Sequence, residues 1–536
     1  MTVIITTFSM FVLACWLALP VTLLAVAGFA NWTATPSKLN HCWRIADRIL
    51  GALILASALV GLLLIVDGPV IDTGLPELGS ALGLYPDGLA VWMALMVSFV
   101  AWIILRYARD YLRGDLAFRA FLPWFLVTVT SVLVLVFTNH LLVLAGAWVG
   151  VSLALHHLLT LYPERTEARL AAAQKFITSR LGDLAVVGAV LLIWRHYGSF
   201  KIPEIHALSA QVGASSTELT VASVLLAIAA ALKCAQIPFH GWLIRVMEAP
   251  TPVSALLHAG VINLGGFLWL RLFPVFDGFT AGHLILLVVG GSTALVAVFT
   301  MMAQTSVKHS LAWSTNAQMG FMLFEIAVGA YTLALLHLLA HSLYKAHSFL
   351  ASGRTVRASV VHFTGRPGLS NAGFALVAAV ISGAMLWLAP GLVENKSILA
   401  ALLVMAVAAA VFGMPSESSS KAKVSVFFMA IALVPLYGLL NSILGPALQS
   451  SGISELPLVA EVFAWALIVS LATLSLVTQL WPDSSWLQRF HHPVSQGFYL
   501  DRPFEQATRR WAKRWLATNT SQGNPAPYLL SSGERP

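Results

Sequence analysis

One lysine of this 536-residue sequence lies deep inside an apolar segment. Lys233 stands in the run Ala-Leu-Lys-Cys-Ala-Gln-Ile-Pro-Phe-His, within an apolar segment over residues 219–243. An ionisable group in hydrocarbon is costly unless it is paired or hydrated. A buried lysine can take up and release a proton near neutral pH, because burial and nearby carboxylates change its proton affinity. Lys233 is therefore a candidate proton carrier; the alternative is a side chain that reaches out to the helix end.

Pro238 follows the lysine and should interrupt its helix. Proline removes one backbone donor and clashes with the preceding turn, so we expect a break near Lys233. Broken helices at membrane depth line cavities or binding sites, because their freed carbonyl groups need water or protein partners. The proline therefore predicts a polar cavity around the lysine.

Titratable residues flank a second, proline-rich turn. His240 and Glu248 precede Pro250 and Pro252, and His258 lies in the helix that follows. Taken alone, a histidine in a helix is more often a packing residue. Beside a buried lysine, His258 becomes a candidate proton relay, because imidazole titrates in the physiological range. His240 and Glu248 are candidate tuning or exit groups for the same pathway.

Three more titratable residues share one face of a later helix. His337, His341 and Lys345 are spaced at i, i+4 and i+8, which places them on a single helix face. Lys308, followed by His309, opens the preceding apolar segment. Such a stripe suits proton hopping through a hydrated seam. Haem ligation is the alternative for histidines in a membrane, but haem ligands face each other across helices.

An arginine and an aspartate open another apolar segment. Arg180 and Asp183 stand at its start, in the run Ser-Arg-Leu-Gly-Asp. Their spacing allows a local ion pair that only fixes the position of the helix. The same two charges could instead tune the lysine pathway, and the sequence leaves both interpretations open.

The composition is that of an integral membrane protein. Hydrophobic residues make up 58% of the chain and charged residues only 10%, against about a quarter charged residues in soluble domains. The net charge of +8 sits in short loops between apolar runs, which argues against nucleic-acid binding. The cysteine spacing indicates neither a disulfide framework nor a zinc site. No phosphate loop, nucleophile triad or metal-ligand cluster is recognisable, so we expect a transport subunit without a cofactor of its own, not an enzyme.

Long apolar segments recur along the whole chain and predict about fifteen transmembrane helices, each near the ~20 residues that a bilayer core requires. The segments are 3–30, 48–66, 87–106, 119–138, 140–161, 176–194, 219–243, 253–273, 282–303, 308–328, 331–352, 371–389, 396–413, 423–442 and 456–481. The first segment has neither a basic leader nor a small-residue cleavage site. We therefore expect a retained helix, not a cleaved signal.

Charge alternates between successive loops. Basic residues gather in the odd-numbered loops and in the tail, whereas the second loop carries Asp67, Asp72, Glu77 and Asp87. Cytoplasmic loops of membrane proteins are enriched in lysine and arginine. The pattern therefore predicts a multi-pass protein of the cell (inner) membrane, with its N-terminus outside and its C-terminus in the cytoplasm.

The chain turns polar after residue 481. Residues 504–517 mix arginine and lysine with Phe504, Trp511 and Trp515 at helical spacing. This pattern predicts an amphipathic helix that lies on anionic lipid or docks a partner, and the sequence does not choose between the two. A polar linker covers residues 415–423, and the chain from about Asn519 onward is expected to be disordered.

Several of these runs resemble one known family. The most specific are Lys233 to Pro238, the run Ala-Pro-Thr-Pro-Val-Ser-Ala-Leu-Leu-His-Ala that ends at Ala259, and Gln-Met-Gly at residues 318–320. They resemble the proton-conducting antiporter-like membrane subunits that respiratory complex I (its ND5-type subunit) shares with Mrp sodium/proton antiporters. The resemblance covers roughly residues 85–400, the larger part of the chain.

The resemblance implies an all-α fold with two inverted five-helix repeats, the first of which holds the broken helix of Lys233. It implies N-terminal spans over residues 1–118, an antiporter-like core over 119–413, C-terminal spans over 414–482 and a cytoplasmic tail over 483–536. Lys233 would be the central lysine, with His258 as the relay beside it. A weaker correspondence makes Lys396 a candidate exit lysine. The path into the second repeat would use Lys308, His337, His341 and Lys345.

Two departures separate the chain from the respiratory and antiporter branches. The family carries a glutamate after the tryptophan of a Gly-Trp-Glu motif, and Val149 holds that position here. Asp183, His156 or His157 could replace this partner of the lysine. The chain also lacks the long lateral helix and final anchor with which ND5-type subunits brace complex I. A third branch fits better, the membrane subunit (DabB) of the DAB inorganic-carbon accumulation complexes.

Membership of that branch implies a division of labour. This chain would conduct protons, or another cation, down their gradient. A large carbonic-anhydrase-like partner of the DabA type, which is expected to hold zinc, would use that energy to hydrate CO2 to bicarbonate. The alternative is a proton-translocating subunit of a respiratory NADH-quinone oxidoreductase or of an Mrp-type Na+/H+ antiporter. A haem-bearing redox protein is the third possibility, which a visible absorption spectrum would detect.

Overall fold

Helices form almost all of the protein. The computed structural model describes residues 2–33, 35–67, 83–211, 216–276, 278–358, 369–393, 396–415, 418–448, 453, 455–481 and 484–521. The α-helices are α1 (Thr2–Trp32), α2 (Pro36–Asp67), α3 (Gly88–Tyr111), α4 (Ala117–Phe137), α5 (Leu141–Leu159), α6 (Thr166–Tyr197), α7 (Ile202–Ser209), α8 (Thr217–Lys233), α9 (Gly241–Arg245), α10 (Thr251–Ala259), α11 (Leu264–Leu272), α12 (Ala281–Met302), α13 (Val307–Ala327), α14 (Tyr331–Ala358), α15 (Leu369–Leu388), α16 (Ser397–Phe412), α17 (Ser420–Leu444), α18 (Leu458–Leu480), α19 (Ser485–Ser495) and α20 (Arg502–Ser521). Within these ranges no β-strand forms, so the all-α prediction is confirmed.

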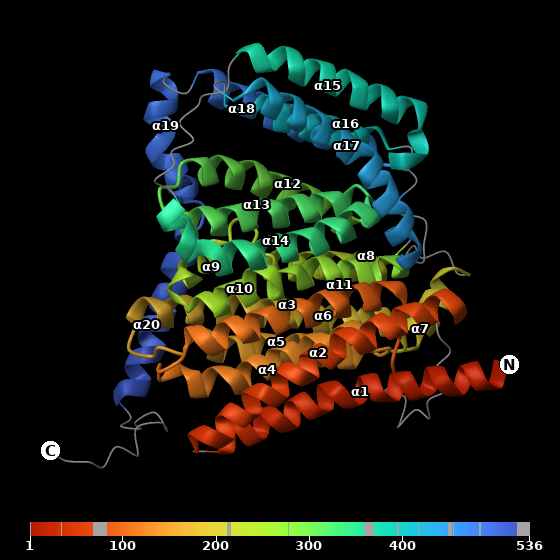
Figure 1. Ribbon diagram of the computed structural model, residues 1–536, viewed down its shortest axis with the longest axis vertical. Helices are drawn as coiled ribbons and strands as arrows, with labels where there is room; N and C mark the ends of the chain where they lie inside the picture. Colours follow the sequence, from red (N-terminus) through yellow and green to blue (C-terminus); the bar gives the residue numbers. More distant parts are fainter. Residues whose placement is uncertain are drawn as a thin grey trace.

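The long helices lie side by side in one elongated bundle (Figure 1). α1 and α2 form one edge of the bundle, α15 to α18 form the opposite edge, and α3 to α14 lie between them. The most extensive helix packing joins α12 to α13 and α6 to α8. The predicted proton-pathway residues belong to this middle part of the bundle.

The apolar segments read from the sequence coincide with helices or pairs of helices. In the part of the chain that the structure describes, 11 helices are long and apolar enough to cross a membrane. Four segments fall outside that set and correspond to α8, α13, α14 and α16. α8 stops early at Lys233 and α16 has only 16 residues, while α13 and α14 carry the polar stripe. A multi-pass membrane protein is established, and the number of about fifteen spans stays a prediction.

The helix that carries Lys233 ends at that residue, as the position of Pro238 in the sequence predicted. α8 ends at Lys233 and α9 does not begin until Gly241. The Ile237–Pro238 peptide bond in the connection is cis. The backbone amide of Ile237 donates a hydrogen bond to Thr293 Oγ1 on α12 at 3.1 Å. A neighbouring helix thus satisfies one of the backbone groups that the break frees inside the bundle.

A buried ion pair ties α11 to α3. Arg271 donates to both carboxylate oxygens of Asp87, at 2.6 and 3.0 Å, and to the carbonyl of Val136 at 3.2 Å. Asp87 also caps α3 by accepting from the backbone amide of Ala90. Both charged side chains are almost fully buried. The terminal nitrogens of Arg271 and both carboxylate oxygens of Asp87 have partners, so the pair serves to position the two helices.

The end of the chain runs across the ends of the bundle helices instead of along them. We call residues 484–521, which contain α19 and α20, the C-terminal strap; Figure 1 shows it crossing one side of the bundle. Its first part contacts α12 and α13: Gln304 Nε2 donates to the Ser495 carbonyl at 2.8 Å, and His240 and Trp313 lie beside Gly497. Its second part, α20, packs against α6.

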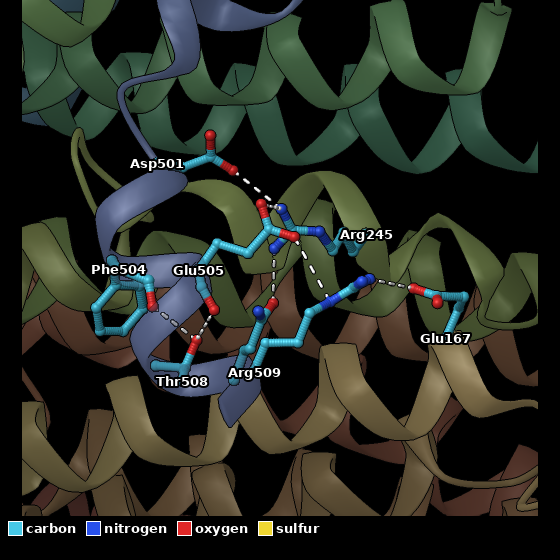
Figure 2. A network of polar contacts seen from close by, with 8 residues as sticks. Glu167, Arg245, Asp501, Phe504, Glu505, Thr508 and Arg509 are labelled. Atoms are coloured by element: carbon cyan, nitrogen blue, oxygen red, sulfur yellow. Dashed lines mark hydrogen bonds and ion pairs between the residues drawn. The ribbon is translucent and has the colours of Figure 1, made fainter. Parts of the chain in front are cut away.

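Ion pairs hold α20 against the bundle (Figure 2). Arg245 on α9 pairs with Asp501 at 3.1 Å and with Glu505 at 2.6 Å. Arg509 pairs with Glu167 on α6 at 3.0 Å. The inner face of this amphipathic helix is therefore covered by the chain itself, which neither sequence-based interpretation, lipid or partner, had anticipated. Predicted disorder from about residue 519 falls largely outside the described residues.

Candidate proton pathway

Lys233 is buried at the end of α8, next to the break. Its side chain is only 9% exposed, so the ammonium does not reach solvent at a helix end. Nζ donates to Ser152 Oγ on α5 at 3.1 Å and lies 4.2 Å from the centre of the Trp148 ring. The position at a helix C-terminus also favours a cation, because the unpaired carbonyls there carry partial negative charge.

A serine hydroxyl, not a glutamate, accepts the hydrogen bond of the Lys233 ammonium group. Val149 is half-buried on α5, and Ser152 lies about one turn further along the same helix. Of the candidate substitutes, His157 stacks on Trp124, with ring centres 3.7 Å apart, and therefore faces α4. His156 approaches α6, with its ring 5.3 Å from that of Phe176. Neither histidine is hydrogen-bonded to Lys233 in the part of the chain that the structure describes.

Arg180 and Asp183 form the local ion pair that their spacing allowed. Arg180 NH2 lies 2.6 Å from Asp183 Oδ2, and the carboxylate is nearly buried. Asp183 also lies within electrostatic reach of Lys233. The local ion pair is thus present on α6, and tuning of the lysine pathway by these two charges stays a prediction.

A second lysine, Lys175, completes this cluster. Its sequence context gives no sign of burial, because Lys175 stands among the basic residues of a predicted loop. In the structure it lies within α6, is 3% exposed, and donates from Nζ to the Ser152 carbonyl at 2.8 Å. A small cavity between α5, α6 and α8 is lined by both lysines together with Trp148, Ser152, Thr178 and Trp242.

We call the helices around Lys233 (α5, α6, α8, α9 and α10) the first helix group and the α13–α14 pair the second; His258 connects the two groups. It lies in the last turn of α10 and is fully buried. Its Nδ1 is 3.1 Å from Thr315 Oγ1 on α13, and its ring stacks on Phe349 of α14 at 4.4 Å. Nearby, Asn263 Nδ2 donates to Ser342 Oγ at 2.7 Å. His258 thus lies where the Lys233 helix group meets the α13–α14 pair.

The predicted stripe on α14 is real and gains an acidic partner from α13. Lys345 is fully buried and donates to Ser314 Oγ at 2.8 Å and to the Leu311 carbonyl at 3.1 Å. His337 Nδ1 lies 2.9 Å from a carboxylate oxygen of Glu325. Glu325 is 7% exposed and was missed in the sequence analysis. His341 lies between His337 and Lys345 on α14, and both of its ring nitrogens are buried without a hydrogen-bond partner in the described part of the chain.

The remaining predicted residues lie at the margins of this series. Lys308 is half-buried in the first turn of α13, one turn before the carbonyl that Lys345 contacts. Lys396 caps α16 and donates to the carbonyl of Gly329, beyond the other end of α13. α13 has 21 residues, or about 30 Å at its usual rise. The titratable series along α13 and α14 thus extends over most of a bilayer thickness.

His240 lies in the break and the Glu248 side chain lies outside the described residues. His240 is 1% exposed, and its ring centre lies 5.1 Å from that of Trp313 on α13. It therefore lies between the broken helix, α13 and the C-terminal strap. Among the described residues, no group of three or more His, Cys, Asp or Glu side chains is placed to hold a metal ion.

Family models match most of this bundle. The model described as NADH:quinone oxidoreductase/Mrp antiporter, TM matches residues 138–448, and the model described as NADH-Ubiquinone oxidoreductase (complex I), chain 5 N-terminus matches residues 75–122. The chain belongs to the NADH:quinone oxidoreductase/Mrp antiporter family. The family resemblance read from the Lys233 and His258 runs is thereby confirmed.

Relatives of this antiporter-family chain include inorganic carbon transporter subunits. A probable inorganic carbon transporter subunit DabB from Hydrogenovibrio crunogenus is 37% identical over 76% of this chain and 79% of its own length. The NADH-quinone oxidoreductase subunit L of Pseudomonas aeruginosa is 35% identical over 51% of this chain and 45% of its own length. An Mrp complex from Dietzia sp. shares the fold at a TM-score of 0.61 and 23% identity, over 96% of this chain and 61% of that one.

Proposed function

We propose that this chain is the membrane subunit of an energy-coupled inorganic carbon pump. Protons, or another cation, run through it down their gradient and drive CO2 hydration in a carbonic-anhydrase-like partner of the DabA type. The observation that carries the proposal is the similarity to a DabB subunit along 79% of that protein's length. The buried lysine and histidine series supports the cation-conducting part, because ionisable groups inside a membrane mark ion and proton pathways.

Lys233 is the proton carrier of the first helix group. Its ammonium is held by the Ser152 hydroxyl and the face of Trp148, both of which also tolerate the neutral amine. A carboxylate in contact would instead fix the proton in an ion pair. The lysine can therefore change its protonation state without leaving a buried, unpaired carboxylate behind.

The second helix group carries the proton along α14. Lys345, His341 and His337 follow one another on one face of that helix, and Glu325 accepts at its far end. Imidazole can receive a proton on one ring nitrogen and release it from the other, which suits hopping through water molecules. Thr315 orients His258 between the two groups.

Catalysis belongs to the partner in this scheme. Zinc is expected there, where it would supply a metal-bound hydroxide for attack on CO2. This chain contributes the pathway and the coupling surface and is not itself an enzyme.

The deciding experiment is uptake of labelled inorganic carbon by cells that lack carbonic anhydrase. The cells express this chain with its DabA-type partner, with and without a protonophore. We expect uptake that needs both proteins and collapses with the protonophore. Lys233→Ala should abolish uptake while the chain still inserts, and Lys38→Ala, at an exposed lysine of α2, should leave uptake unchanged. Wild-type uptake by Lys233→Ala would reject the role of the central lysine.

A respiratory or Mrp-type role is the alternative, and the similarity to subunit L favours it. It predicts co-purification with several small membrane subunits and dependence on NADH or sodium. No carbon uptake by a correctly inserted complex, together with sodium/proton exchange in vesicles, would replace the carbon-pump proposal with this one.

A further inference from the structure

Two buried lysines from different helices converge on one serine. Lys233 of α8 donates to the Ser152 hydroxyl at 3.1 Å, and Lys175 of α6 donates to the Ser152 carbonyl at 2.8 Å. Both lysines line the same cavity, and they are close enough to interact electrostatically. A lysine pair around one polar residue is an unusual arrangement inside a bundle, because two ammonium groups repel each other most strongly where water is scarce.

The surrounding charges do not neutralise this pair. The titratable and charged groups around Lys175 are Lys233 on α8, Arg180 and Asp183 on its own helix, and His156 on α5. Asp183 is in contact with Arg180 at 2.6 Å, so that carboxylate is already paired with a permanent cation. No carboxylate is hydrogen-bonded to either lysine in the described part of the chain. Two positive charges would therefore be left unneutralised if both amines were protonated.

Lys175 also lies between Lys233 and the end of the bundle where the C-terminal strap crosses. Its neighbour Gln174 accepts from Arg245 of α9 at 2.8 Å. Arg245 is in turn paired with Asp501 and Glu505 of the strap (Figure 2). The first turn of α6 lies at this same end, since Glu167 pairs with Arg509. Along α6, the side chain of Lys175 is thus the buried amine nearest to the strap end of the bundle.

We propose that Lys175 and Lys233 share a single proton around Ser152, and that Lys175 passes protons between Lys233 and the strap end of the bundle. In each transfer one N–H bond breaks on the protonated lysine and one forms on the neutral lysine, through the Ser152 hydroxyl or water in the cavity. The pair carries one positive charge before and after the transfer. This inference rests on the proposed cation-conducting function and names a second lysine for it.

The arrangement replaces a carboxylate with a cation beside the central lysine. A glutamate at position 149 would stabilise the protonated form of Lys233, whereas Lys175 opposes it by like-charge repulsion. A shared proton removes that repulsion, because only one of the two amines is charged at a time. The pair thereby accounts for a functional lysine site that lacks a glutamate at position 149.

Proton flux through the intact complex tests this proposal. This chain and its partner are reconstituted into liposomes that contain a pH-sensitive dye, and flux is started by an imposed membrane potential. We expect Lys175→Met and Lys175→Arg each to lower the flux about a hundredfold, the scale of positioned proton transfer. Methionine cannot hold the proton, and arginine cannot release it. Lys38→Met is the matched control and should conduct like the wild type.

Lys175→His separates a proton carrier from a structural residue. Histidine titrates at a lower pH than lysine, so this variant should keep part of the flux and conduct better at pH 6 than at pH 8. Flux at the wild-type level in Lys175→Met, rescue by Lys175→Arg, or a Lys175→His variant no better than Lys175→Met would each overturn the proposal.

Two further measurements separate a folding defect from a loss of proton transfer. Thermal unfolding of the purified complexes shows which variants fold. If Lys175→Met does not insert, Lys175→Gln replaces it, because glutamine keeps a hydrogen-bond donor but cannot hold the proton; wild-type flux in that variant rejects the shared proton. A wild-type complex that conducts no protons removes the proposed function itself, and this inference with it. A wild-type complex that conducts protons without carbon uptake removes only the carbon part and leaves the lysine pair to be judged by its variants.

Discussion

A serine hydroxyl and an indole ring, not a carboxylate, surround the ammonium group of Lys233. A cation–π contact and a helix C-terminus each stabilise a cation modestly. An ion pair in the same place would bind the proton far more strongly, because attraction between opposite charges grows as the dielectric constant falls. Weak stabilisation suits a residue that must lose its proton in every cycle.

Glu325 and His337 form a hydrogen-bonded unit near the far end of α13. We predict that Glu325→Gln lowers proton flux about tenfold or more, because the imidazole loses the carboxylate that receives its proton. His337→Ala should lower flux to a similar extent. The double variant should be no slower than either single variant, because residues that act as a unit are not additive. Flux through the reconstituted complex measures all three.

An additive result for the Glu325 and His337 variants would contradict a shared step. His341→Ala is the companion variant and should also slow the flux, since its ring lies between His337 and Lys345 on the same helix face. Unchanged flux in both histidine variants would reduce the stripe to packing residues.

Single-residue chemistry was partly predictable from the sequence. Lys233 and His337 stand out because each interrupts an apolar run, where a charge is costly. Glu325 was overlooked because its significance depends on α13 packing against α14, which brings it to His337. Lys175 does not stand out in the sequence, because arginines at 165, 169 and 180 surround it and the stretch resembles a basic loop. Only the rotation of α6 and its packing decide that Lys175 is buried while Arg165 is exposed.

At the scale of helices, the end of α8 could be predicted from the sequence, whereas the surface on which α20 packs could not. Pro238 carries its own steric consequence, so the end of α8 follows from local chemistry. An amphipathic sequence shows only that one face of a helix needs an apolar or polar complement. Which surface provides it depends on long-range packing, and here α6 and α9 of the same chain do so.

Glu505 should decide whether α20 stays on the bundle. It lies between Arg245 and Arg509, so Glu505→Arg would leave three arginines in contact. The pairs are partly exposed, and each contributes ~1 kcal/mol or less. We therefore predict that trypsin cuts α20 of the purified protein about fivefold faster, as a loss of ~1 kcal/mol implies. Gln506→Arg adds the same charge on the exposed face and should leave the rate unchanged; equal rates in the two variants would contradict the clamp.

At the scale of the whole molecule, both helix groups are joined twice. His258 of α10 contacts α13 and α14 in the interior. At the strap end, Ser495 accepts from Gln304 in the α12–α13 connection, while Asp501 pairs with Arg245 on α9. A displacement of the strap would therefore act on the broken helix and on the α12–α13 pair together. The strap end is accordingly the place where a partner could sense or drive changes in the pathway.

The orientation of the bundle in the membrane decides the order in which inward-moving protons meet the pathway residues. Glu164 precedes α6 and Ala207 lies beyond it on α7, and the 32 residues of α6 separate the two ends of the bundle by about 48 Å. The loop at Glu164 is basic, so it should face the cytoplasm. In a Cys15→Ser background, a membrane-impermeant maleimide should label Ala207→Cys in intact cells and Glu164→Cys only after permeabilisation. The reverse pattern would place the strap and its partner surface outside the cell, and the inward proton gradient would then meet Lys345 and Lys175 before Glu325.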